Sequence, residues 1–111
     1  MYISDLGRTL GYEPVQPEYQ DREVEDGYTS DLLSDVMANA ASDSVLITIQ
    51  AHKNTVAVAS LVGISAIVVC NSRPIPDDMT EAAKQEGVAV YRTAENQFTA
   101  SARVHGLLSL K

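Results

Sequence analysis

The 111-residue sequence has only one cysteine and no long hydrophobic run, and each of these features excludes a class of protein. Cys70 has no second cysteine to pair with, which excludes a disulfide-stapled secreted scaffold. No apolar run approaches the roughly 20 residues that span a bilayer. Residues 1–11 also lack the basic segment and apolar core of a secretory signal. We therefore expect a cytoplasmic protein with no membrane contact and, from its length, a single domain over residues 1–111.

The signatures of several enzyme classes are also missing. There is no phosphate-binding loop of the GxxxxGK[ST] type, no GxGxxG and no GxSxG, and the six glycines are isolated. His52 and His105 lie far apart, and neither CxxC nor HxxxH occurs, so zinc-ligand spacing is absent. We expect no metal and no cofactor, and neither phosphate-loop kinase nor serine hydrolase chemistry.

The net charge of −7 lies entirely at the N-terminal end. Residues 1–36 contain nine acidic and two basic residues, whereas residues 37–111 contain six of each. Nucleic-acid binding needs clustered Lys and Arg, which this chain does not have. The acidic stretch is interpreted as a solvated surface, with a docking face for a basic partner as the alternative.

The central part of the sequence alternates between two kinds of segment. Runs rich in β-branched residues, typical of buried strands, occupy 44–49, 64–70 and 88–91. Helical segments are expected at 54–62, 77–86 and 96–108. Gly63 and Gly87 are placed to end the first two helices. This alternation predicts an α/β fold, a layered domain with a mostly parallel central sheet flanked by helices.

The N-terminal part has weaker signals. Apolar residues recur at helical spacing over 31–41, which predicts a helix with caps at its start. Residues 12–28 predict one or two short edge strands around Val15 and Val24, and a short helix is expected near 4–10. We expect the acidic segment 1–28 to pack on or beside the core.

Buried positions and an interface follow from this assignment. Four strand residues should be nearly fully buried: Ile47, Ile49, Ile67 and Val69. Three leucines lie close together at the C-terminal end: Leu107, Leu108 and Leu110. An exposed apolar patch of this kind often marks an interface, so we expect a homodimer.

A candidate ligand site lies at the edge of the sheet where the parallel strands end, because open α/β sheets bind ligands there. The loops at that edge are 50–53, 71–76 and 92–96. The candidate ligand-binding residues are Gln50, His52, Lys53, Asn54 and Arg73. Their amide, imidazole and cationic side chains suit an anion, and Asn54 is expected to cap the helix that starts there. The alternative is that Asn54 only caps and His52 only fills a turn.

A second polar set precedes the first buried strand. It comprises Ser30, Asp31, Ser34 and Asp35. Serine and aspartate are common helix caps, and phosphorylation of a serine is the functional alternative. Cys70 ends a buried strand and is interpreted as a small hydrophobe, with a reactive thiol as the alternative.

The order of these segments resembles the DRTGG domain family. The matching segments are the strand 45–49, the helix 56–61, the strand 66–70, and the tracts 86–93 and 98–100. The tracts 27–36 and 47–54 are similar to a small stand-alone branch of that family. The Asp-Arg-Thr-Gly-Gly tract itself is absent, and Gln50-Ala51-His52 stands where related domains often carry Gly-Asp-Arg.

The resemblance implies a regulatory or dimerising module that lies beside other domains. In one such context within the family, adenine nucleotides bind nearby. It also implies likeness to the N-terminal domain of HPr kinase/phosphatase, without the separate kinase domain. The stand-alone branch is similar to proteins found beside iron hydrogenase and electron-transfer components, which implies an accessory role.

Three functions remain open at this point. The first is a non-catalytic regulatory or ligand-binding module that is homodimeric and takes a nucleotide or a phosphorylated small molecule. The second is a purely structural module that contacts a protein partner and binds no small molecule. The third is an enzyme that uses His52 or Cys70.

Overall fold

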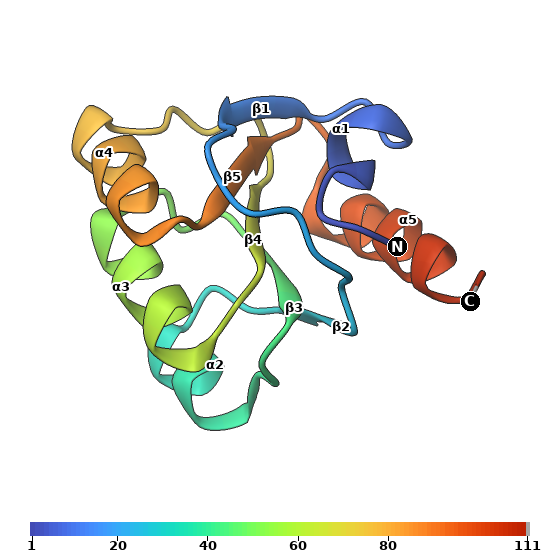
Figure 1. The fold of residues 1–111 in the computed structure, drawn as a ribbon, viewed down its shortest axis with the longest axis horizontal. Coiled ribbons are helices and arrows are strands. Elements are labelled where there is room, and N and C mark those ends of the chain that lie inside the picture. Colours follow the sequence, from blue (N-terminus) through green and yellow to red (C-terminus); the bar gives the residue numbers. More distant parts are fainter. Residues whose placement is uncertain (111) are drawn as a thin grey trace.

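The computed structural model describes residues 1–110, which form a five-stranded sheet between two layers of helices (Figure 1). The strands are β1 (Glu13–Gln16), β2 (Asp26–Thr29), β3 (Ser44–Thr48), β4 (Ala66–Val69) and β5 (Ala89–Arg92). The helices are α1 (Asp5–Arg8), α2 (Leu33–Asn39), α3 (Lys53–Val62), α4 (Asp77–Glu86) and α5 (Gln97–Leu108). No helix in this part of the chain combines the length and apolar character of a membrane span.

The sheet is mostly parallel, as the alternation predicts. Its strand order is β1-β5-β4-β3-β2, and β2 to β5 run parallel to one another. β1 joins the other side of β5 in the antiparallel direction. The expected α/β layered fold is therefore confirmed. The loops that follow β2, β3, β4 and β5 all emerge at one edge, called the carboxyl edge below.

Each face of the sheet has its own hydrophobic cluster. α2, α3 and α4 cover one face, and α1 and α5 cover the other (Figure 1). Ile67 and Val69 face the three-helix layer and are fully buried, while Ile47 faces the opposite layer and is 2% exposed. Full burial of Ile49 was a wrong expectation. Ile49 lies one residue beyond β3 and is only partly covered, at the carboxyl edge.

α3 and α4 end at the two glycines that the sequence marks, Gly63 and Gly87. α4 covers the predicted residues, and Gly63 and Gly87 adopt left-handed backbone conformations at φ 87° and 66° after α3 and α4. α2 is shorter than the expected helix over 31–41, and its N-cap is Leu32, with no capping side chain. The reason is that Asp31 binds elsewhere, at the carboxyl edge, so the helix starts two residues later.

The N-terminal segment contributes to the core in two ways. β1 includes Val15, as expected, and lies at the edge of the sheet. Val24 is not in a strand but is fully buried in the cluster beneath α1 and α5. The second strand, β2, starts two residues after Val24 and has no fully buried residue, which is why its sequence gives no apolar signal.

Candidate functional site

The carboxyl edge holds all five predicted ligand-binding residues. Gln50 and His52 lie in the loop after β3, Lys53 and Asn54 begin α3, and Arg73 lies in the loop after β4. β3 and β4 are hydrogen-bonded neighbours, so the two loops leave the sheet side by side. All five side chains are exposed to solvent. The edge thus combines the N-terminus of α3 with two cationic side chains, Lys53 in the first turn of that helix and Arg73 in the loop after β4.

His52, not Asn54, caps α3. The imidazole Nδ1 of His52 accepts a hydrogen bond from the Asn54 backbone N–H at 3.1 Å, and Asn54 lies within the helix. The prediction of Asn54 as the cap was wrong, because histidine is not among the usual capping residues. Nδ1 can accept this bond only while it carries no proton.

The five residues do not share one hollow. Lys53 and Asn54 line a hollow of about 280 Å³ in the groove between α3 and α4. Ser72, next to Arg73 in sequence, lines a larger one of about 380 Å³ at the other side of the carboxyl edge. His52 and Arg73 line neither of these hollows.

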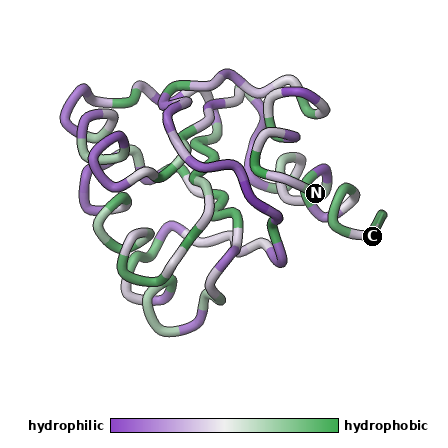
Figure 2. Tube along the Cα trace, viewed as in Figure 1, coloured by the Kyte–Doolittle hydropathy of each residue, from purple (hydrophilic) through white to green (hydrophobic). Residues whose placement is uncertain are grey.

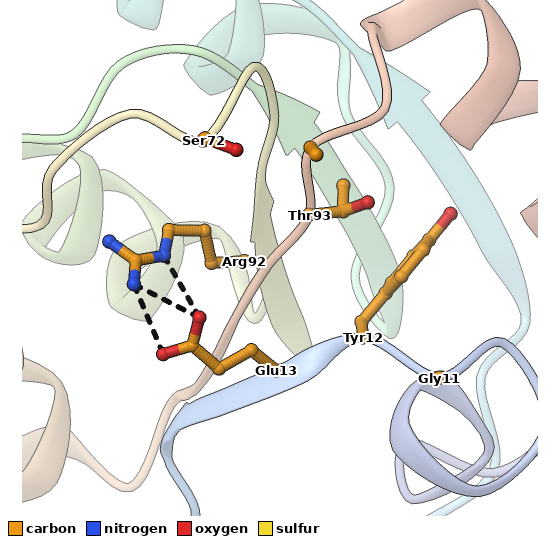
Figure 3. Close-up of a pocket in the computed structure, with 7 residues that line it drawn as sticks. Gly11, Tyr12, Glu13, Ser72, Arg92 and Thr93 are labelled. Atoms are coloured by element: carbon orange, nitrogen blue, oxygen red, sulfur yellow. Dashed lines mark hydrogen bonds and ion pairs between the residues drawn. The ribbon is translucent and has the colours of Figure 1, made fainter.

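The larger hollow lies where β5 meets β1, and Figure 3 shows its lining. The Arg92 guanidinium donates three hydrogen bonds to the Glu13 carboxylate, at 3.0 to 3.1 Å. Ser72 and Thr93 also line the hollow, and both carry a hydroxyl group (Figure 3). These groups offer hydrogen-bond donors and acceptors, but the ion pair leaves little net charge for an anion.

The loop beside this hollow has an unusual backbone. Asn71 and Ser72 both have positive φ, at 60° and 50°, which costs energy in residues other than glycine. Two hydrogen bonds hold the loop in place: Asn71 N–H donates to the Glu95 carbonyl at 3.0 Å and Ser72 N–H to the Thr93 carbonyl at 2.9 Å. The loops after β4 and β5 are thereby fixed to each other.

Asp31 connects three segments at the carboxyl edge by hydrogen bonds. Its Oδ1 accepts hydrogen bonds from the Thr48 hydroxyl at 3.0 Å, the Ile49 N–H at 2.9 Å and the Gln97 side-chain amide at 2.9 Å. The loop after β2, the end of β3 and the start of α5 meet at this carboxylate. Gln97 is 66 positions away in sequence, and no local pattern predicts such a contact.

A second polar network lies beneath the edge, on the α1 and α5 side. The Tyr12 hydroxyl donates to the Glu95 carboxylate at 2.6 Å, and the Arg103 guanidinium donates to the same carboxylate. Arg103 also lies over the Tyr12 ring, 5.6 Å from its centre, and donates to the Leu10 carbonyl at 3.2 Å. These residues satisfy one another, which indicates that they hold the fold rather than a ligand.

Cys70 is fully buried beside the same carboxylates. Burial and, to a lesser extent, the negative charges of Glu95 and Asp31 raise the pKa of the Cys70 thiol from 9.0 to about 11. The thiol therefore stays protonated at neutral pH, and a protonated thiol is a poor nucleophile. Within the described residues, no group of three His, Cys, Asp or Glu side chains lies in a position to hold a metal ion.

The raised pKa of Cys70 predicts alkaline sensitivity. An unfolded thiol ionises near pH 9, whereas the folded one stays neutral up to about 11, so the unfolded state releases its proton first. The pKa values of Tyr12 and Tyr19 are also raised, mainly by burial. We expect these groups to leave the free energy of unfolding unchanged between about pH 7 and pH 9 and to make it fall progressively above pH 9, as measured by urea titration. A Cys70→Ala variant should show a smaller fall, and a profile that stays flat to pH 11 contradicts the assignment.

Comparisons with known proteins give a structural neighbour but no sequence relative. No family model matches the sequence, and no curated protein does. The fold is similar to the CBS and DRTGG domains of the regulatory region of Clostridium perfringens pyrophosphatase, solved in complex with its activator, diadenosine tetraphosphate. The TM-score is 0.72 at 16% identity, and the match covers 90% of this chain and 44% of that one.

This likeness supports a DRTGG-like fold, in agreement with the resemblance in the sequence. The neighbour is a regulatory region that binds a nucleotide activator.

Proposed function

We propose that the chain is a non-catalytic regulatory module, a homodimer, that binds a nucleotide or another phosphorylated anion at the carboxyl edge of the sheet. The candidate contacts are Gln50, His52, Lys53, Asn54 and Arg73. The resemblance to the stand-alone branch of the DRTGG family implies that the module is accessory to hydrogenase or electron-transfer proteins.

The observation that carries the proposal is the charge at the N-terminus of α3. The first turn of α3 contains no acidic residue and begins with Lys53, and Arg73 lies in the loop after the neighbouring strand β4, in a protein whose net charge is −7. Helix N-termini and cations together favour phosphate groups. The structural neighbour supports the ligand class, because it was solved with a nucleotide activator bound.

Binding can be tested with AMP, ATP and inorganic phosphate as probes. A ligand that binds only the folded chain raises its thermal stability, by about 2.7 kcal/mol at a concentration of 100 Kd. We expect the nucleotides to stabilise the chain and Arg73→Ala to weaken binding about tenfold or more, because a charge-assisted hydrogen bond is lost. His52→Ala removes the side chain that caps α3 and should also weaken binding.

Lys84→Ala is the matched control. Lys84 is an exposed cation on α4 that pairs with Glu18 at 3.3 Å, and its removal changes the net charge as Arg73→Ala does. Its affinity for the nucleotide should be unchanged within about twofold at physiological salt, where distant charges are screened. Equal affinities in all variants, with chemical-shift changes far from residues 50–54, remove this site. Stabilisation by none of the probes overturns the ligand-binding role and favours a purely structural interaction module.

A further inference from the structure

The outward side of α2 and α3 carries almost no charge. Residues 36–76 contain only three of the chain's eight basic and fifteen acidic residues: Asp43, Lys53 and Arg73. Lys53 and Arg73 lie at the carboxyl edge, and Asp43 pairs with Arg22 at 3.2 Å. The acidic residue of α2, Asp35, accepts hydrogen bonds from the Tyr28 hydroxyl and the Asn39 amide. Asp35 keeps its charge, because these donors are neutral, but the exposed residues of the two helices other than Lys53 are all uncharged.

The same surface exposes large apolar side chains. Leu61 in the last turn of α3 is 73% exposed, and Met37 in the last turn of α2 is 50% exposed. The segments that follow the two helices are joined, because Asp43 N–H donates to the Gly63 carbonyl at 2.8 Å. Figure 2 shows hydrophobic residues along the end of α3, in contrast to the mainly hydrophilic α4. The α2–α3 face is defined here by its exposed residues Ser34, Met37, Ala38 and Leu61.

Two other surfaces of the chain, α4 and the C-terminal leucines, are less suited to self-association. The exposed residues of α4 include Asp77, Asp78, Glu81, Lys84 and Glu86. At the C-terminal end, Leu107 and Leu108 are partly covered by their own chain, and Leu108 packs against the core. Leu110 is 80% exposed and borders a hollow that it shares with Asp5. The leucine patch expected from the sequence is thus largely used within the fold.

We propose that a second copy of this chain packs on the α2–α3 face about a twofold axis, with Leu61 and Met37 near its centre. The inference rests on the homodimer of the proposed function. A twofold interface sets a surface against itself, so a charged patch meets its own charge and is repelled. Each copy carries a net charge of −7, and the α2–α3 face is a surface on which that repulsion is small and apolar area is gained. The exposed Ala38, a small residue of α2, allows the helices of the two copies to approach closely.

The test is the mass of the full-length chain in solution, by light scattering and sedimentation at tens of micromolar. We expect the wild type to have twice the mass of one chain. Leu61→Glu and Met37→Glu place a carboxylate in the interface and should weaken dimerisation at least tenfold, giving monomers. Leu110→Glu and Phe98→Glu are matched controls on other exposed apolar residues, 80% and 83% exposed, and should remain dimers. Circular dichroism and thermal melts confirm that each variant is folded, as expected for exposed positions.

The outcomes separate this inference from the proposed function. A monomeric wild type overturns the homodimer and this interface, while nucleotide binding at the carboxyl edge is judged by its own titration. A dimer that survives Leu61→Glu, or that the Leu110→Glu control dissociates equally, overturns the α2–α3 face but leaves the dimer. Dissociation by Leu61→Glu and Met37→Glu alone supports the proposal.

Discussion

Replacing Ile67 with alanine is expected to lower the free energy of unfolding by about 2–5 kcal/mol. Ile67 is fully buried in β4, with Leu46 of β3 and Val90 of β5 as its partners in the sheet. Its side chain belongs to the cluster beneath α2, α3 and α4, which includes Val56 and Met79. The substitution removes three buried carbon atoms together with their packing contacts. Because β4 lies in the centre of the sheet, its neighbours cannot move in to fill the cavity.

Urea unfolding followed by circular dichroism measures this loss. The denaturation midpoint should fall while the slope of the transition stays constant, because the native surface is unchanged. Ile67→Val is the matched control: it removes one methyl group at the same position and should cost only about 0.5–1.5 kcal/mol. A loss below about 1 kcal/mol for Ile67→Ala contradicts the central position of β4.

The sequence predicts the central elements well because their signals are local. β3, β4 and β5 are covered on both faces, so their residues form nearly continuous apolar runs. Gly63 and Gly87 mark the ends of α3 and α4 for the same reason, since a left-handed residue is needed there. β2 was misplaced because it is an edge strand that contributes little to the core, so neither alternation nor an apolar run reveals it.

The candidate site was predictable only in part. The carboxyl edge follows from the parallel topology, and the positions of Gln50, Lys53 and Arg73 at that edge follow with it. How side chains are used there depends on contacts between distant segments. Glu95 meets Tyr12, which is 83 positions away, and no pattern within a helix or strand predicts that pairing. Similarly, the use of His52 as a cap depends on the direction of a loop.

The contact of Asp31 with three segments leads to the second large effect. Asp31→Ala is expected to lower the free energy of unfolding by about 2–3 kcal/mol, because hydrogen bonds to a charged group contribute about 1.5–3 kcal/mol each in buried settings and are not additive. The Ile49 N–H and the Thr48 hydroxyl would lose their acceptor at a partly buried position. The Gln97 amide at the start of α5 would lose the same acceptor. The loops after β2 and β3 should therefore become more mobile.

Urea unfolding and amide exchange at Ile49 measure the two parts of this prediction. Asp31→Asn is the matched control, because its carbonyl oxygen occupies the position of Oδ1 and still accepts hydrogen bonds without the charge. It should retain most of the stability and the slow exchange of the Ile49 amide, which Asp31→Ala should lose. If alanine and asparagine have the same small effect, Asp31 does not hold the edge together. If both substitutions are strongly destabilising, the negative charge of Asp31 is what stabilises the edge, because asparagine keeps an acceptor oxygen but not the charge.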